Sequence, residues 1–165
     1  MKRIILLIYV LVPLWSIGQN SLDELLDQYN NETIPYISAK ELHLIQHDVI
    51  LLDAREPIEY QTSHIKGAIH VGYDHFDMKK VHNQKLNKES KIVVYCSIGI
   101  RSEDISEHLK KVGFQNVYNL YGGIFEWKNK NFEVVDTNGK VTEQVHAYSV
   151  RWGKLLHNAK KVYTP

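Results

Sequence analysis

A second cysteine is absent from this 165-residue chain, so Cys96 cannot close a disulfide within it. A surplus of charge is absent too, since 20 lysine and arginine residues balance 19 aspartate and glutamate residues to a formal net charge of +1. This balance creates no field that would attract nucleic acid or a membrane surface, so we expect any anionic ligand to be held locally. Hydrophobic residues make up 44% of the chain, which is typical of one globular domain.

A hydrophobic run of membrane-spanning length is missing at the N-terminus. The apolar run at residues 4–14 falls short of the roughly 20 residues that cross a bilayer, and Pro13 interrupts it. A basic pair precedes the run, and the small residues Ser16 and Gly18 follow it. We therefore expect residues 1–18 to be a signal peptide that is cleaved on export to the periplasm or the extracellular space; an uncleaved membrane anchor is the alternative.

Strand and helix patterns alternate through the middle of the chain. The continuously apolar runs VILLD and KIVVY are typical of parallel strands that are covered on both faces. Ser38 with Glu41 three residues later forms the capping box that begins a helix. We expect strands at 34–38, 49–53, 68–71, 91–96 and 116–120, and helices at 21–29, 39–47, 56–64, 77–84, 101–112 and 123–129. This order predicts an α/β fold with a mostly parallel central sheet and helices on both faces.

The tail of the chain has a different pattern. Alternating apolar and polar residues flank Asn138 and Gly139, which is the strongest short signal for a β-hairpin. The last stretch, 149–165, is basic and amphipathic, and its secondary structure stays open. The predicted divisions after the signal peptide are a helical segment at 19–32, a central domain at 33–130, and a C-terminal hairpin with a basic tail at 131–165.

Cys96 lies in the stretch YCSIGIRS, where a predicted strand turns into a predicted helix. Such a turn directs backbone N–H groups inward, and with the dipole of the helix they form a cradle for an anion. Gly99 lets the backbone curl without a side-chain clash. Beside Arg101 and the helix start, we expect Cys96 to be largely thiolate and thus an activated nucleophile. The alternative is a buried cysteine that acts only as a small hydrophobe.

Three motifs, in this order, make the chain resemble a single rhodanese domain over about residues 33–130. They are LLDAREPIEYQTSHIKGAIHV, the loop YCSIGIRS, and YGGIFEW. One departure from the family is visible, because Ser63 stands where glycine is usual. It is far from the thiol in the sequence, so we expect it to leave the chemistry intact.

The resemblance implies that Cys96 carries sulfur during catalysis. Its thiolate would attack the outer sulfur of thiosulfate or of a persulfide donor, and a thiol or cyanide acceptor would then remove that sulfur. No cofactor, metal or nucleic acid is expected, and the sequence identifies no protein partner. The loop residues that the resemblance assigns to substrate binding are Ser97, Ile98, Gly99, Ile100 and Arg101.

Two other functions use a similar loop. A cysteine phosphatase or arsenate reductase needs five residues between its cysteine and arginine, whereas four separate Cys96 from Arg101. The shorter loop therefore favours sulfur transfer. A binding or sulfur-sensing module with the same fold is the alternative without turnover, although such modules often lack the cysteine.

Asp53, Arg55 and Ser102 are expected to support the site. Asp53 and Arg55 end a predicted strand, and we favour a pair that caps the next helix over contact with the ligand. His43 and His47 lie four residues apart on a predicted helix. Because no metal-binding signature accompanies them, a solvated helix face is favoured over a metal site.

Overall fold

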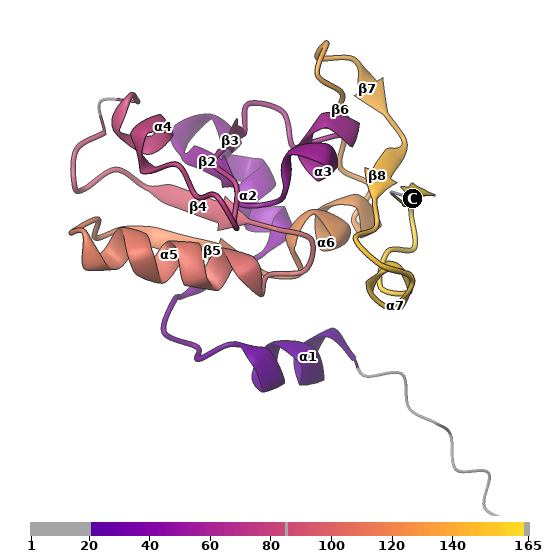
Figure 1. Cartoon of the computed structure of the whole chain (residues 1–165), viewed down its shortest axis with the longest axis horizontal. Helices are drawn as coiled ribbons and strands as arrows, with labels where there is room; N and C mark the ends of the chain where they lie inside the picture. Colours follow the sequence, from indigo (N-terminus) through magenta and orange to yellow (C-terminus); the bar gives the residue numbers. More distant parts are fainter. Residues whose placement is uncertain (1–20, 85, 164–165) are drawn as a thin grey trace, which may run out of the picture.

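Five parallel strands form the central sheet of the protein (Figure 1). They are β1 (Tyr36–Ile37), β2 (Ile50–Asp53), β3 (Ile69–His70), β4 (Ile92–Tyr95) and β5 (Val117–Leu120). Their order across the sheet is β1-β5-β4-β2-β3, which places β4 between two neighbours. All four residues of β4 are fully buried, as expected for an apolar strand that is covered on both faces.

The computed structural model describes residues 21–84 and 86–163. The signal peptide predicted at residues 1–18 lies outside them. Within the described residues, no helix is both long enough and apolar enough to cross a membrane.

Helices cover both faces of the sheet, so the predicted α/β fold is confirmed. On one face, Val93 of β4 lies in a core cluster with Phe125, and on the other Val94 lies in a cluster with Leu109. Adjacent strand residues point to opposite faces, which explains why these two valines belong to different clusters. The helices are α1 (Leu22–Tyr29), α2 (Ala39–Ile45), α3 (Pro57–Thr62), α4 (Met78–His82), α5 (Arg101–Lys111), α6 (Gly123–Asn129) and α7 (Val150–Gly153).

Capping side chains set the starts of the first two helices. Ser21 and Glu24 form a capping box at α1, and Ser38 forms the predicted one with Glu41 at α2. Three helices, α2, α3 and α4, are shorter than their sequence patterns indicate, and α3 ends at Thr62. α2 passes into a 3-10 turn at Gln46–Asp48, and α4 begins only after its cap, Asp77.

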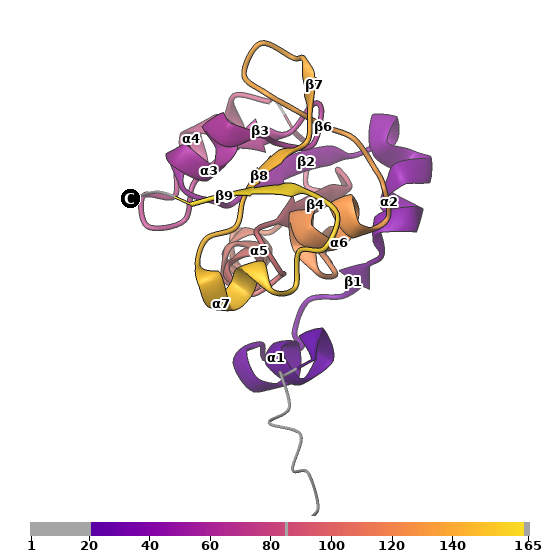
Figure 2. The ribbon, with the colours of Figure 1, turned by 90° about the vertical axis from the view of Figure 1, so that its right-hand side faces the viewer.

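The C-terminal tail contains the predicted hairpin and a second, unpredicted pair of strands. β6 (Val134–Val135) and β7 (Val141–Thr142) are antiparallel around the turn at Asp136, whose carboxylate accepts hydrogen bonds from two turn amides. β8 (Gln144–His146) and β9 (Lys160–Val162) are parallel and lie side by side in Figure 2, with α7 between them in the chain.

The tail packs against the rest of the protein. Val145, Ala147 and Leu156 belong to the same core cluster as Phe125 of α6. A bridge between His64 and Val135 adds two backbone hydrogen bonds of 2.9 Å. The tail is therefore attached through buried apolar side chains that pack against α6 and through the backbone bridge after α3.

Candidate active site

Cys96 follows β4 directly, at the carboxyl edge of the sheet where a ligand crevice is expected. The residue is only 1% exposed, and its Sγ accepts a hydrogen bond of 3.2 Å from the backbone N–H of Gly99. Ser102 Oγ lies 3.5 Å from the same sulfur. The thiol is thus both buried and enclosed by the loop, whereas the sequence hypotheses treated burial and function as alternatives.

The start of α6 holds the outer side of this loop. The N–H of Ile124 donates to the carbonyl of Cys96 at 2.9 Å, and the N–H of Phe125 donates to the carbonyl of Ser97 at 3.1 Å. In a trans peptide the N–H points opposite to the C=O. Because both carbonyls point toward α6, the N–H groups of Ser97 and Ile98 point away from it, as an anion cradle requires.

Two asparagine side chains donate hydrogen bonds to the carbonyl of Gly99, as the N–H groups of α6 do to the two preceding carbonyls. Asn119 Nδ2, from β5, donates to it at 2.8 Å, and Asn30 Nδ2 donates at 2.9 Å. Asn119 also accepts a 2.7 Å hydrogen bond from Ser102 Oγ. Ser102 therefore contacts both the Cys96 sulfur and Asn119, an asparagine that the sequence analysis did not identify.

The YGG motif contributes to the site through Gly123. Its φ is +53°, and a Cβ placed there would lie 2.3 Å from the carbonyl oxygen of Cys96. Only glycine fits this approach, since the neighbouring atoms are backbone. The pair Gly122–Gly123 forms the expected turn, and the structure shows that this turn also fixes the loop.

A buried ion pair joins α3 to the end of the loop. Arg101 Nη1 and Nη2 contact the two carboxylate oxygens of Glu59 at 2.7 and 2.8 Å. Ser97 Oγ donates to Glu59 at 2.9 Å and accepts from Arg101 at 2.9 Å. The sequence analysis assigned Arg101 to the substrate, but its guanidinium is engaged by Glu59, so donor binding by Arg101 stays a prediction.

The charges of this pair reinforce each other. Although burial disfavours both ionised forms, the hydrogen bonds and charge of Arg101 lower the pKa of Glu59 to about 2. Burial also opposes the charge of Arg101, but the bonds to Glu59 and the nearby Cys96 sulfur together raise its pKa. Both groups are therefore charged at neutral pH, beside the buried thiol.

Acidification is expected to remove the stability that Glu59 provides. Its folded pKa of about 2 lies below the ordinary value of 4.5, so the contribution is complete above pH 4.5 and is lost as the pH falls through 2. A difference of this size corresponds to about 3 kcal/mol. Urea unfolding between pH 6 and 2 should show a loss that Glu59→Gln lacks, while the exposed Glu89→Gln control should follow the unmodified protein. Parallel loss in the Glu59 variant would contradict the assignment.

Asp53 and Arg55 form a second buried pair, and both are fully buried. Asp53 accepts from Arg55 Nε at 2.9 Å, from Arg55 Nη2 at 2.6 Å and from the hydroxyl of Tyr95 at 2.6 Å. The favoured pairing is present, but the expected capping of the next helix is wrong, because Glu56 caps α3. Arg55 Nη2 also donates to the backbone carbonyl of Ser63. Because every residue has a backbone carbonyl, this contact does not depend on whether serine or the usual glycine stands at position 63.

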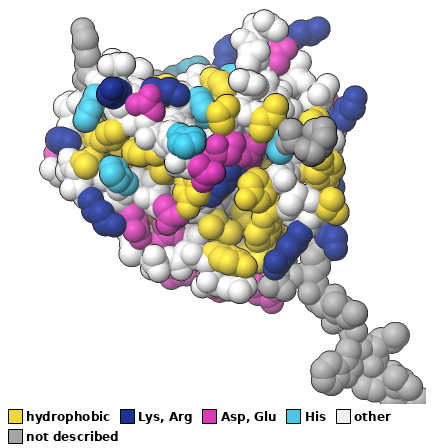
Figure 3. Space-filling view, in the orientation of Figure 1, with side chains coloured by type: hydrophobic (Ala, Val, Ile, Leu, Met, Phe, Trp, Pro, Cys, Tyr) yellow, Lys and Arg dark blue, Asp and Glu magenta, His cyan; other side chains and the backbone are white. Residues whose placement is uncertain are grey.

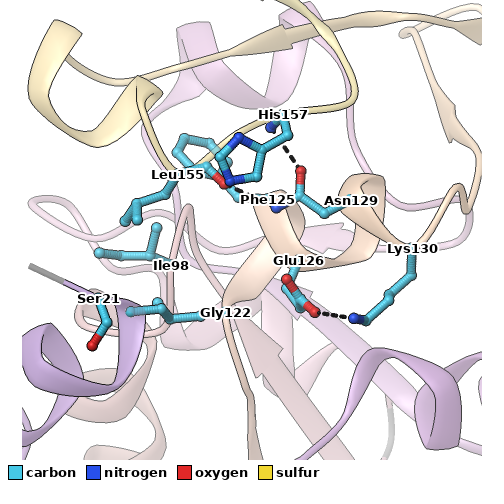
Figure 4. Close-up of a pocket in the computed structure, with 10 residues that line it drawn as sticks. Ser21, Ile98, Gly122, Phe125, Glu126, Asn129, Lys130, Leu155 and His157 are labelled. Atoms are coloured by element: carbon cyan, nitrogen blue, oxygen red, sulfur yellow. Dashed lines mark hydrogen bonds and ion pairs between the residues drawn. The ribbon is translucent and has the colours of Figure 1, made fainter. Parts of the chain in front are cut away.

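Two pockets border the loop on either side of Ile98. One, of about 180 Å³, is lined by loop residues and by aromatic side chains from α1 and the tail. Figure 3 shows hydrophobic side chains gathered where α1 and α7 approach each other, next to a group of acidic side chains. The other, of about 460 Å³, lies between α1, α6 and the tail, where Asn129 accepts from the N–H of His157 (Figure 4).

His43 of α2 and His47 of the 3-10 turn that follows it lie away from this site. His43 stacks on Phe132 with ring centroids 4.1 Å apart. His43 and His47 line a separate pocket that also contains Trp127. Both histidines are exposed, as expected for a solvated face, and His43 also packs against Phe132.

Glu59, Asn119 and Asn30 are the site residues that sequence reasoning missed. Glu59 is part of the first family motif, and its place in that motif was the available signal, while its burial is shown only by the structure. Asn119 is a polar residue within the apolar strand pattern NVYNL, which was the available signal, and the structure shows that it is fully buried and therefore needs a polar partner. Asn30 has no comparable signal, because its role depends on how α1 packs.

The chain belongs to the rhodanese-like domain family, which matches residues 38–130. A relative, thiosulfate sulfurtransferase GlpE of Coxiella burnetii (strain RSA 493 / Nine Mile phase I), is 35% identical over 97 residues, or 58% of this chain and 85% of that protein. The tRNA uridine(34) hydroxylase of Aster yellows witches'-broom phytoplasma (strain AYWB) is 42% identical over 87 residues, which cover 51% of this chain but 28% of that protein.

Solved structures share the fold. A rhodanese-related protein from Thermoplasma volcanium is similar with a TM-score of 0.53 and 28% sequence identity, over 61% of this chain and 97% of that one.

Proposed function

We propose that the protein is a sulfurtransferase that moves a sulfane sulfur through a persulfide on Cys96. The Cys96 thiolate attacks the outer sulfur of thiosulfate, the S–S bond of the donor breaks with its electron pair going to sulfite, and Cys96–S–S⁻ remains. A thiolate or cyanide acceptor then takes the outer sulfur and returns Cys96 as thiolate. A persulfide donor reacts in the same way and leaves as a thiolate.

One observation carries this proposal. The sulfur of Cys96 is enclosed by a loop whose Gly99 N–H donates to it, while the carbonyls of Cys96 and Ser97 are bound by α6. Backbone N–H groups that already face the reacting sulfur stabilise both an anionic donor and an anionic persulfide without reorganising.

The relatives support the class of reaction more than the substrates. Thiosulfate sulfurtransferase is the name of the relative that this chain covers to 85%, whereas the tRNA uridine hydroxylase is covered only to 28%. Thiosulfate or a persulfide is therefore our proposed donor, and a thiol is the proposed acceptor.

A mass measurement tests the proposal. Incubation with thiosulfate and no acceptor should add the mass of one sulfur atom to the peptide that contains Cys96, and cyanide or a reducing thiol should remove it. Hydrolysis of an aryl phosphate that depends on Cys96, with no sulfur adduct, would establish a phosphatase instead. Sulfur that is taken up but never released to cyanide or thiols would indicate a sensing module.

A further inference from the structure

Three aromatic side chains from outside the family domain surround the smaller pocket at the loop. Tyr29 comes from α1, and Tyr148 and Trp152 come from the tail, whereas the family match ends at residue 130. The loop residues Ser97, Ile98, Ile100 and Arg101 form the rest of the lining. The extensions on both sides of the domain therefore meet at the loop that encloses Cys96.

Specific contacts hold these rings in place. Tyr29 and Trp152 meet edge to face with ring centroids 6.3 Å apart. The guanidinium of Arg101 lies over the ring of Tyr148, 4.7 Å from its centroid. Ser149 Oγ accepts the N–H of Trp152 and so caps α7.

The backbone at Tyr148 is unusual. Its φ is +61°, in the left-handed region that a bulky residue seldom adopts, and the residue is still 49% exposed. The N–H of Tyr148 donates to His146 Nδ1 at 3.1 Å, which holds this conformation. A strained backbone that places a half-exposed aromatic ring against a site residue suggests a functional role for the ring.

We propose that Tyr148 and Trp152, with Tyr29, form a subsite for an apolar organic group on the sulfur donor. The inference rests on the proposed sulfur transfer and names its donor class, an organic thiosulfonate R–SO₂–S⁻. The Cys96 thiolate attacks the outer sulfur, the S–S bond breaks, and the sulfinate R–SO₂⁻ leaves with the electron pair. Charge and atoms balance as they do with thiosulfate, and no oxidant or reductant is required.

The size and the mostly apolar lining of the pocket match the organic group of this donor. An apolar cavity of about 150 Å³ holds one benzene ring, and the pocket at the loop is of about 180 Å³. Arg101 lines the same pocket, but Glu59 pairs with its guanidinium, so the anionic head group is left to the backbone N–H groups of the loop. An acceptor thiol with the same organic group shares this chemistry, so the test measures the two half-reactions separately.

The test compares benzenethiosulfonate, methanethiosulfonate and thiosulfate, which differ only in the group on the inner sulfur. The rate of persulfide formation is measured without an acceptor, and the rate of sulfur release from the persulfide to benzenethiol is measured separately. Both rates are compared for the full chain and for Tyr148→Asn and Trp152→Ala. Asparagine tolerates a left-handed backbone, so Tyr148→Asn removes the ring and keeps the chain conformation. Val150→Ala is the matched control, because Val150 is also in α7, is 72% exposed and lies outside the pocket lining.

Each ring variant should lower the rate with benzenethiosulfonate about tenfold relative to thiosulfate, with methanethiosulfonate between the two. Val150→Ala should leave all three rates unchanged. If the ring variants lower all three rates equally, or change none, the subsite assignment is wrong while sulfur transfer stands. If they alter only the release of sulfur to benzenethiol, the pocket serves the acceptor and the donor assignment is overturned.

Binding of benzenesulfinate, measured by calorimetry, separates this inference from the proposed function. Binding that Tyr148→Asn weakens about tenfold, in a protein that transfers no sulfur from any donor, would support the subsite and overturn the transfer. Absence of binding to the unmodified protein would overturn the subsite whatever the kinetics. Thermal unfolding checks each variant, and if Trp152→Ala does not fold, the half-exposed position 148 carries the test alone.

Discussion

Replacement of Cys96 by serine is expected to lower the rate of sulfur uptake from thiosulfate at least about a thousandfold, because a neutral hydroxyl is a far poorer nucleophile than a thiolate. The fold should persist, since oxygen is smaller than sulfur and the N–H of Gly99 can still donate to it. The measurement combines the rate of sulfite release with the mass of the peptide that contains residue 96, and thermal unfolding reports the fold.

Ser102→Ala provides a matched control for this experiment. It removes a hydroxyl 3.5 Å from the sulfur and the hydrogen bond to Asn119, but it leaves the thiol in place. We expect a loss of no more than about tenfold, in line with a single neutral hydrogen bond. If Cys96→Ser retained sulfur uptake comparable to that of Ser102→Ala, Cys96 would not be the nucleophile.

The features predicted correctly from the sequence are those with local signals. The continuously apolar run KIVVY predicts a parallel strand that is covered on both faces, and all four residues of β4 are fully buried. The glycine within the loop and the helix that begins at Arg101 follow within five residues of Cys96. Likewise, Asn138 and Gly139 predict a turn because its geometry depends on neighbouring residues only.

The partners of the loop were missed because they are distant in the chain. Glu59 lies 42 residues from Arg101, and Asn119 lies 20 residues from Gly99. Their contacts depend on the strand order, which places β5 and β2 on the two sides of β4. A pattern of apolar residues predicts the strands without their order, so it cannot show which polar side chains meet.

The second strand pair of the tail was missed for a related reason. β9 is Lys160–Val162, three residues without a distinct apolar alternation, and its parallel partner β8 precedes it by a helix. Parallel pairing of such short strands is stabilised by packing, here through Val145 of β8 in the core. The basic residues of 149–165 that the structure describes are exposed on the surface, so the basic composition does not predict the pairing of β8 with β9.

Replacement of Asp53 by asparagine is expected to destabilise the fold by about 3–5 kcal/mol, because it leaves the buried charge of Arg55 without its counter-ion. The amide of asparagine would also present N–H groups where Arg55 and Tyr95 both donate, at 2.6 Å in each case. Domains of this size have a total stability of about 5–15 kcal/mol, so the variant should unfold at a much lower urea concentration.

Two controls show whether the loss comes from the buried charge. Glu126→Gln breaks a pair with Lys130 whose atoms are 2.8 Å apart, but the Lys130 side chain is 45% exposed, so this variant should lose far less stability than Asp53→Asn. Replacing both partners, as Asp53→Leu with Arg55→Met, removes the unpaired charge and should recover part of the loss. Equal stability of Asp53→Asn and the unmodified protein would mean that Arg55 is neutralised by another group. Failure of the double variant to improve on Asp53→Asn would assign the loss to the hydrogen bonds from Tyr95 and Arg55 rather than to the charge.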